Sequence, residues 1–328
     1  MKSFAHHNAT SITEAIDLLK SYRGGAKLNA GGTDLLGLLK DDVLVEYPEA
    51  VINIKTIEGL DYICEDDRGL RIGALATLAS IASSPIVKEA YNALSEAALS
   101  VASVQVRHMG TIGGNLCQEV RCWYYRYPHQ IGGRILCLRK GSGPCLAVRG
   151  DNRYQAIIGG KKCFAVCPSD TAIALTALDA DLIIVGGKGE RSIPVRDFYH
   201  SLGNALKPNE MLTEVRIPRP SAKARQTFLK LTLRKPIDFA IVSVATVITV
   251  SDGVCQDARI ALGAVAPTPI RATGAEQAII GKPVDSQTAA VAAEAAVSGA
   301  RPLSQNEYKV QQTRALVQRA LLGQTSPY

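Results

Sequence analysis

This sequence of 328 residues lacks several features that would place it quickly in a known class. Aromatic residues make up only 5% of the chain, with a single tryptophan, so Ala, Val, Ile and Leu must fill the interior. No stretch approaches the roughly 18 uninterrupted apolar residues of a membrane-spanning helix. The start, MKSFAHHNATSITEA, has no apolar segment of the kind found in secretion signals. We therefore expect a cytoplasmic protein without a membrane span.

Common nucleotide and zinc motifs are also absent. The chain has neither a G-x-G-x-x-G turn nor a Walker loop, which disfavours NAD on a Rossmann sheet and ATP on a P-loop. It has no C-x2-C pair, so zinc-ribbon and thioredoxin interpretations fit poorly. The five histidines are scattered, and no acid/base constellation for an organic substrate stands out. We therefore predict no catalytic residues.

The positive charge of the chain is confined to one segment. The formal net charge is +7, yet nine basic residues and only one acidic residue lie between Val120 and Lys162. The rest of the chain holds 28 basic and 29 acidic residues. A nucleic-acid or membrane-surface function would have to rest on this segment alone. Its basic residues are Arg121, Arg126, Arg134, Arg139, Lys140, Arg149, Arg153, Lys161 and Lys162.

Six of the eight cysteines fall in the same stretch. From Cys117 to Cys167 their spacing is C-x4-C-x14-C-x7-C-x17-C-x3-C. Clustered cysteines in a reducing compartment favour metal binding over disulfides. Four thiolates on an iron–sulfur core leave a negative charge that the surrounding arginines and lysines would offset. The charge and the cysteines thus have one common explanation that needs no nucleic acid.

Periodicity predicts an α+β chain with a boundary after Pro218 and Pro220. Ser11-Ile-Thr-Glu14 is a capping box that starts a helix ended by Gly24-Gly25. We expect strands over 27–30, 50–54, 70–72 and 182–185, and helices from 35, over 85–103 and over 171–178. Beyond the boundary, strands over 241–250 and 258–262 precede three helices, the last with a capping box at 304–307. Helices on one side of a sheet are the economical arrangement there.

Two glycine-rich turns are candidates for phosphate contacts. Gly31-Gly32-Thr33-Asp34 lies between a strand and a helix, and Gly110–Asn115 forms a similar turn some 80 residues later. Glycines let backbone N–H groups approach a phosphate because no Cβ is in the way. One such turn is ordinary turn chemistry. Two of them suggest a dinucleotide pyrophosphate held between them.

Four sequence blocks together resemble one known family. Leu28-Asn-Ala-Gly-Gly-Thr-Asp-Leu35 and Gly110-Thr-Ile-Gly-Gly-Asn-Leu116 resemble the two FAD-binding loops of the flavin subunit in the molybdenum hydroxylase (xanthine dehydrogenase) family. Pro168-Ser-Asp170 resembles the family's next block. Arg259-Ile-Ala-Leu-Gly-Ala-Val-Ala-Pro267 resembles the signature of its C-terminal flavoprotein domain. The blocks stand in the family's order along nearly the whole chain.

The resemblance implies an FAD-binding domain over 1–220, of the vanillyl-alcohol-oxidase (PCMH) type with two α/β subdomains. A small α+β domain of the CO dehydrogenase flavoprotein type would occupy 221–328. Asp170 would bind the adenosine portion or ribityl hydroxyls of FAD. Lys230 would lie near the isoalloxazine ring, unless it is a solvated strand lysine. The loop residues carried over as FAD contacts are Leu28, Asn29, Ala30, Gly31, Gly32, Thr33, Asp34, Leu35, Thr111, Gly114, Asn115 and Gln118.

The cysteine segment, about 118–166, resembles an insertion found in a subgroup of these subunits, including those of 4-hydroxybenzoyl-CoA reductases and bacterial aldehyde oxidoreductases. That insertion holds one [4Fe–4S] cluster. By position its ligands here would be Cys122, Cys137, Cys145 and Cys163. Cys167 is the rival to Cys163 for the fourth position. The alternative is that these cysteines are core or surface thiols of an ordinary loop.

The function that the resemblance implies is electron transfer. A large partner with the molybdenum cofactor would perform substrate chemistry, and a small partner would carry two [2Fe–2S] clusters, in a heterotrimer or a dimer of heterotrimers. FAD would exchange electrons with an external ferredoxin, NAD or quinone. Two other classes stay open: a freestanding FAD-dependent oxidoreductase, and a basic metal-binding nucleic-acid module supported only by the run 121–127.

Overall fold

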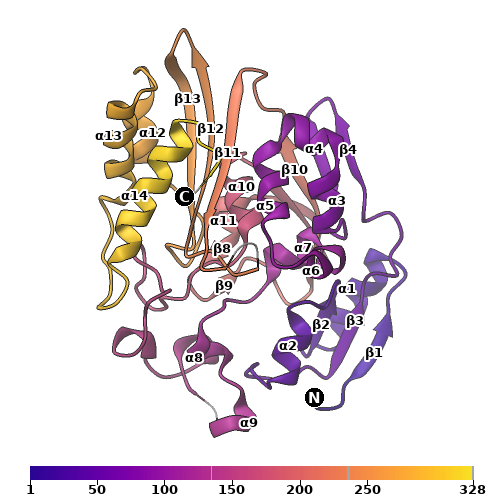
Figure 1. Ribbon diagram of the computed structural model, residues 1–328. Coiled ribbons are helices and arrows are strands. Elements are labelled where there is room, and N and C mark those ends of the chain that lie inside the picture. Colours follow the sequence, from indigo (N-terminus) through magenta and orange to yellow (C-terminus); the bar gives the residue numbers. More distant parts are fainter. Residues whose placement is uncertain (134, 235–236, 327–328) are drawn as a thin grey trace.

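The computed structural model describes residues 1–133, 135–234 and 237–326 (Figure 1). The indigo N-terminal unit, a larger unit of sheet and helices, and a C-terminal sheet with its own helices succeed one another along the chain. In this view the cysteine segment, with α8 (Trp123–Arg126) and α9 (His129–Gly132), runs below the last two parts and beside the first. No helix in the described part of the chain is long and apolar enough to cross a membrane.

The N-terminal unit is a small parallel sheet with two helices. Its strands, in the order β1-β3-β2, are β1 (Ala5–Asn8), β3 (Ala50–Asn53) and β2 (Ala26–Asn29), and its helices are α1 (Ile12–Ser21) and α2 (Leu35–Lys40). The predicted first capping box is confirmed, because the Ser11 hydroxyl accepts a hydrogen bond from the Glu14 N–H at 3.1 Å. The Glu14 carboxylate accepts from the Thr10 N–H at 2.8 Å. These contacts fix the start of α1. The first glycine turn follows β2, which is an edge strand of this sheet.

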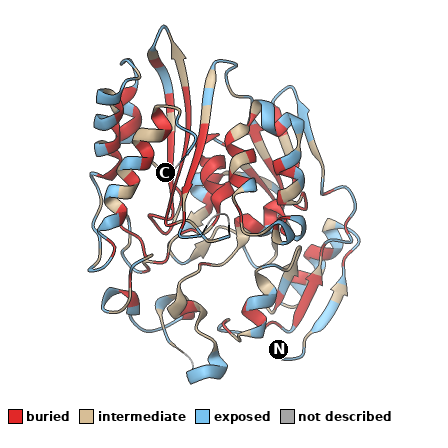
Figure 2. Cartoon of the chain, viewed as in Figure 1, coloured by how far each residue is buried: buried red, intermediate tan, exposed pale blue. Residues whose placement is uncertain are grey.

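The second unit is built on an antiparallel five-stranded sheet of order β4-β5-β10-β6-β7. These strands are β4 (Ile63–Asp66), β5 (Gly69–Gly73), β10 (Glu210–Pro218), β6 (Asp181–Gly186) and β7 (Gly189–Pro194). One face is buried under helices, as Figure 2 shows in red. The helices of this unit are α3 (Leu78–Ser83), α4 (Pro85–Ala90), α5 (Asn92–Leu99), α6 (Val104–Met109), α7 (Ile112–Cys117), α10 (Asp170–Ala177) and α11 (Val195–Phe198).

The single helix predicted over 85–103 is wrong. The chain leaves helical geometry at Tyr91, with φ −132° and ψ 42°, so α4 and α5 are separate helices. Tyr91 is fully buried, and its hydroxyl donates to the Glu65 carboxylate at 3.1 Å. Tertiary packing of one aromatic residue therefore overrides a helical pattern that is continuous in sequence.

The C-terminal domain is a four-stranded antiparallel sheet covered on both faces. Its own helices cover one face, as predicted, while α5 and α10 of the preceding unit cover the other. One face of the sheet therefore contributes to the main core of the preceding unit, and the other face forms a separate core with its own helices. Its elements are β11 (Ala224–Leu231), β12 (Val242–Ser251), β13 (Val254–Gly263), β14 (Ile270–Arg271), α12 (Thr273–Ile279), α13 (Ser286–Val297) and α14 (Tyr308–Leu321).

The capping box predicted at 304–307 is wrong. Helix α14 begins at Tyr308, and Glu307 at its N-cap makes no side-chain cap. The Ser304 hydroxyl instead accepts a hydrogen bond from the Asn152 amide, at 3.1 Å. The polar residues before α14 thus serve a long-range contact with the cysteine segment.

Little regular structure exists within the cysteine segment. It holds α8 (Trp123–Arg126), α9 (His129–Gly132) and two single 3₁₀ turns, η1 (Leu138–Lys140) and η2 (Leu146–Val148). Figure 2 shows α9 exposed, whereas the chain on either side of the segment re-enters buried parts of the fold. A short hairpin, β8 (Tyr199–His200) with β9 (Gly203–Asn204), leads into β10. With so little backbone hydrogen bonding of its own, the segment is held mainly by side-chain contacts with the rest of the chain.

Candidate flavin site and cysteine pocket

A cavity of about 460 Å³ lies between the first unit and the second. The turn after β2 forms one wall, the start of α7 forms another, and the chain from β9 to β10 closes a third side. The two glycine turns predicted to share a dinucleotide therefore face the same space. The predicted residues on its wall are Leu28, Asn29, Ala30, Gly31, Gly32, Thr33, Asp34, Leu35, Thr111, Gly114 and Gln118.

The two glycine turns touch each other through backbone. A Cβ atom at Gly31 would lie only 1.9 Å from the Met109 carbonyl oxygen, so a larger residue cannot be accommodated without moving one loop. Gly32 adopts φ +70°, a left-handed conformation that favours glycine. The glycines thus serve two purposes, since one allows loop-to-loop contact and the other allows the turn that opens onto the cavity.

The second glycine sequence is not an open turn. Thr111 caps α7, with its hydroxyl accepting from the Gly114 N–H at 3.1 Å. Gly113 lies in that helix, and a Cβ there would come within 2.9 Å of the Ala74 carbonyl oxygen. The glycines at this position therefore allow a helix to pack tightly beside the cavity.

The Asn29 side chain offers a buried acceptor to this cavity. Its Oδ1 atom has no hydrogen-bond partner among the described residues, although it is fully shielded from solvent. Asn29 lies on the cavity wall. A buried carbonyl oxygen without a partner is costly, and a ligand hydroxyl or amine would satisfy it. The residues present therefore fit a polar, elongated cofactor with hydroxyl groups, such as FAD.

Asp34 links the flavin turn to the cysteine segment. Its carboxylate lies 2.7 Å from the Arg121 guanidinium and 2.6 Å from that of Arg126, and it accepts a hydrogen bond from the Glu119 N–H at 2.9 Å. Arg121 precedes Cys122 directly. Burial lowers the pKa of Arg121 to about 10, an effect that the Asp34 charge opposes. The structure therefore joins the two predicted cofactor sites through one carboxylate.

Three of the predicted flavin contacts lie away from the cavity wall. Lys230 and Asp170 form a buried ion pair at 2.6 Å, and Lys230 also donates to the Ser100 carbonyl oxygen. Burial raises the pKa of Asp170, and Lys230 opposes that rise. The Asn115 side-chain oxygen is held inside the protein by hydroxyls of α10 and its cap. For these three residues, contact with FAD stays a prediction.

Four cysteines line a second, smaller cavity within the described part of the segment. They are the four that the resemblance selects, namely Cys122, Cys137, Cys145 and Cys163. Tyr124, Tyr125, Arg139 and Lys162 line the same space. Burial raises the pKa of the Cys122 thiol, and a hydrogen bond from Gln155 opposes this. Thiols gathered with cations around one space are a donor set suited to an iron–sulfur cluster.

The outer two cysteines belong to other surroundings. Cys117 lines the flavin cavity, and Cys167 packs into the main core between the sheet and its helices. Burial raises the pKa of each of these thiols to about 12, which disfavours thiolate formation. Within residues 1–133, 135–234 and 237–326, no group of three or more His, Cys, Asp or Glu side chains is close enough to hold a metal ion, and this includes the four cysteines of the smaller cavity.

The basic residues of the segment divide between internal pairs and the surface. Arg139 pairs with Glu119 at 3.0 Å, and Arg153 pairs with Asp151 at 2.7 Å. Lys161 and Lys162 are exposed. Arg134 lies outside the described residues. Of the basic residues in the segment, Arg139 and Lys162 line the four-cysteine cavity.

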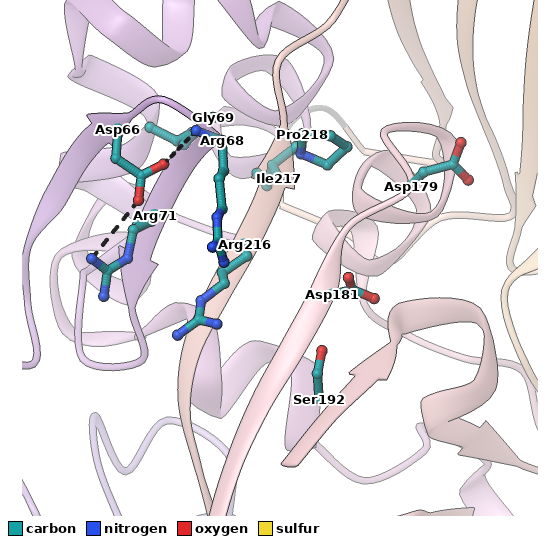
Figure 3. A pocket seen from close by; sticks show the side chains of 11 residues that line it. Asp66, Arg68, Gly69, Arg71, Asp179, Asp181, Ser192, Arg216, Ile217 and Pro218 are labelled. Carbon is teal, nitrogen blue, oxygen red and sulfur yellow. Dashed lines mark hydrogen bonds and ion pairs between the residues drawn. The ribbon is translucent and has the colours of Figure 1, made fainter. Parts of the chain in front are cut away.

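A third cavity, of about 410 Å³, lies on the open face of the five-stranded sheet (Figure 3). Its walls are charged, and they include Arg71 and Arg216 from the neighbouring strands β5 and β10, with Arg71 beside Asp66 in the figure. The buried Glu214 carboxylate lies between these two, accepting from Arg71 at 2.6 Å and from Arg216. Most of these charges are neutralised by each other, so we interpret this face as a solvated sheet surface. Sequence analysis did not anticipate this network.

Sequence analysis also missed one wall of the flavin cavity. Gly203, Asn204, Lys207 and Pro208 line it from the hairpin and the turn before β10. These residues lie more than 80 positions beyond the second glycine turn and form no recognisable motif. Only the pairing of β10 with β5 and β6 brings them to the site.

A cavity between two subdomains, walled by two glycine turns and carrying an unpaired acceptor, defines a flavin-binding protein of the α+β class. Comparison with protein families agrees. Residues 2–220 match the FAD binding domain in molybdopterin dehydrogenase, and residues 227–324 match the CO dehydrogenase flavoprotein C-terminal domain. The chain therefore belongs to the family of FAD-binding subunits of molybdopterin-dependent oxidoreductases.

Individual relatives support this assignment. The chain is 36% identical to the aldehyde oxidoreductase FAD-binding subunit PaoB of Escherichia coli, over 94% of both chains. It is 30% identical to the carbon monoxide dehydrogenase medium chain of Hydrogenophaga pseudoflava, over 97% of this chain and 96% of that one. A solved structure of carbon monoxide dehydrogenase from the same organism superposes with a TM-score of 0.78, covering 98% of this chain and 96% of the other at 30% identity. The predicted fold class is confirmed.

Proposed function

We propose that this chain binds FAD together with one [4Fe–4S] cluster and passes electrons between them within a molybdenum hydroxylase complex. The observation that carries the proposal is the gathering of Cys122, Cys137, Cys145 and Cys163 around one cavity. Asp34 ties that segment to the flavin turn through Arg121 and Arg126. When bound, FAD would supply two-electron redox chemistry and the cluster one-electron transfer.

The residues of the chain itself would have three tasks. The glycine turns would hold FAD by backbone contacts, and Asn29 would accept a hydrogen bond from a cofactor hydroxyl. The four cysteines would ligate the cluster. Arg139 and Lys162, on the same cavity, would stabilise its negative charge.

The partners follow from the family. The E. coli relative is named as a subunit of an aldehyde oxidoreductase, and the Hydrogenophaga relative as the medium chain of carbon monoxide dehydrogenase. By this similarity, our chain would associate with a large subunit carrying the molybdenum cofactor and a small subunit carrying [2Fe–2S] clusters. An external ferredoxin, NAD or quinone would exchange electrons with the complex, and this exchange would take place in the cytoplasm.

Activity of the purified single chain separates this proposal from a freestanding flavoenzyme. The isolated chain should not oxidise aldehydes, purines or acyl-CoA aromatics, because substrate chemistry would belong to the partner. Its FAD should still accept electrons from an artificial reductant such as dithionite and pass them to an artificial acceptor. Substrate-dependent reduction of the single chain would contradict the subunit role.

Single Cys→Ala variants test the ligand set. Variants of Cys122, Cys137, Cys145 and Cys163 should lose the cluster, measured as iron content and as the reduced-state EPR signal under anaerobic conditions. Variants of Cys117 and Cys167 should keep it, because these two thiols lie in the flavin wall and in the core. Cluster loss in Cys167→Ala beside an intact Cys163→Ala would transfer the fourth ligand position to Cys167.

A further inference from the structure

We propose that Gln155 is a positioning residue that sets the reduction potential of the iron–sulfur cluster by hydrogen bonding to the sulfur of Cys122. This inference rests on the proposed function, since it requires a cluster on that sulfur. The Gln155 amide nitrogen lies 3.5 Å from the Cys122 Sγ atom. Gln155 is only 4% exposed, so this amide is shielded from competing water.

The backbone of Gln155 is hydrogen-bonded to side chains of the C-terminal domain. Its carbonyl oxygen accepts hydrogen bonds from the Asn306 amide and from the Lys309 side-chain nitrogen, each at 3.0 Å. Both of these side chains are fully buried. Asn306 lies just before α14, and Lys309 lies in the first turn of that helix. The backbone position of Gln155 is therefore fixed by another domain.

Two further contacts extend this attachment. Lys309 also donates to the Ala264 carbonyl oxygen at 2.6 Å, which anchors it to the end of β13. Asn152 is fully buried, donates to Ser304 and accepts from the Gln305 N–H at 2.9 Å. Two buried polar side chains from beyond residue 300, Asn306 and Lys309, thus bond to the backbone of residues 154–156, and buried Asn152 bonds in the other direction to residues 304 and 305. Such a network is costly to bury unless each member is satisfied, and these members are.

The chemistry of an N–H···S contact gives the network a function. A donor beside a cluster sulfur withdraws electron density from it and stabilises the more negative, reduced state. Removal of that donor should therefore lower the reduction potential. Because Asn306 and Lys309 fix the Gln155 backbone, the C-terminal domain would control a property of a cluster that is bound by another part of the chain.

The test is Gln155→Met, which keeps the side-chain length and removes the donor. Gln130→Met is the matched control, because Gln130 lies in the same segment, is exposed and donates to the Lys40 carbonyl oxygen instead. Midpoint potentials of cluster and FAD are measured by anaerobic redox titration with EPR and absorption. We expect Gln155→Met to lower the midpoint potential of the cluster by about 59 mV. For a one-electron couple, this is about a tenfold change in the equilibrium between reduced cluster and reduced FAD, in favour of FAD. The FAD potential and the control should match wild type.

An unchanged cluster potential in Gln155→Met would overturn the inference. Should that variant lose its iron, reduced wild-type protein labelled with ¹⁵N in glutamine side chains decides the matter. A magnetic coupling between the cluster and an amide ¹⁵N, absent in unlabelled protein, supports the contact, and no coupling overturns it. Wild-type protein that contains FAD but no iron would instead refute the proposed function.

Discussion

At the residue scale, the flavin site depends on a glycine at a position where a Cβ atom would collide with the opposite loop. Gly31 lies against a backbone carbonyl of the opposite loop, whereas Gly37, six residues on in α2, has nothing within 4 Å of its potential Cβ. The sequence shows glycines at both positions and does not distinguish them. Only the approach of the two loops, which are nearly 80 residues apart, makes one of them indispensable.

Gly31→Ala should therefore bind FAD more weakly while keeping the fold. The added methyl group would push the two turns apart at the cavity, and we expect at least about a tenfold weaker affinity, equivalent to about 1.4 kcal/mol. Gly37→Ala is the control, and it should bind FAD normally with equal or slightly higher stability, because alanine favours a helix interior. Flavin fluorescence during titration of the deflavinated proteins measures both. Equal affinities in the two variants would show that the loops do not share the cofactor.

Asp34 shows how a residue can be predicted in the right place with an incomplete role. The resemblance assigns it to FAD, and it does lie on the cavity wall. Both of its carboxylate oxygens, however, are engaged by residues of the cysteine segment. The sequence gives no sign of this partnership, because Asp34 and Arg126 are 92 positions apart.

At the element scale, the ion pairs of Asp34 with Arg121 and Arg126 should decide whether the cysteine segment stays attached to the flavin unit. Asp34→Asn removes the charge that pairs with two arginines, at a cost of about 1–3 kcal/mol for charge-assisted hydrogen bonds in a half-buried setting. We expect faster trypsin cleavage within 120–162. Asp17→Asn, which breaks an exposed pair with Lys20, is the control and should behave as wild type. Equal cleavage of Asp34→Asn and wild type would contradict the attachment.

Helix α14 was predicted correctly as a helix, but the capping box predicted at its start is wrong. Its apolar stripe predicts a helix correctly, but its start does not follow the local capping pattern. Ser304 and Asn306 instead satisfy buried groups of the cysteine segment, and Lys309 does so from within the helix. Local capping rules could not reveal this, because the partners are about 150 residues away in sequence.

Burial of Lys309 predicts a specific pH dependence of stability. Burial lowers its pKa from 10.5 to about 7, so from about pH 7 to 10.5 the unfolded chain binds one more proton at this position. Stability of the wild type should therefore rise with pH across this window by up to about 1.4 kcal/mol per pH unit from this group. Lys309→Met lacks this contribution. Urea unfolding of both proteins at pH 7 and pH 9 measures it, and identical pH slopes would contradict it.

At the scale of the whole molecule, the order of sequence blocks was enough to predict the family and fold class. The two glycine turns, predicted to share one ligand, do face one cavity. The sequence could not show that α5 and α10 cover the second face of the C-terminal sheet, nor that the turn before β10 closes the flavin cavity. Those features arise from long-range packing, to which periodicity and motifs are blind.

At the same scale, the cysteine segment is attached to both domains. The cysteine segment leaves the fold directly after the α7 wall of the flavin cavity and returns at Cys167, next to the start of α10. Its two ends are thus fixed by the flavin domain, while its middle is held by Asn306 and Lys309 of the C-terminal domain. A cluster in this position would be in contact with both domains and beside the flavin cavity.

The most direct test of the account is the cofactor content of the wild-type chain, purified anaerobically. Flavin, iron and acid-labile sulfide are measured per chain, and EPR spectra are recorded after reduction. We predict about one FAD, four irons and four sulfides per chain, with a cubane-type signal in the reduced protein. A chain that carries stoichiometric FAD but no iron after anaerobic reconstitution with iron and sulfide would contradict it.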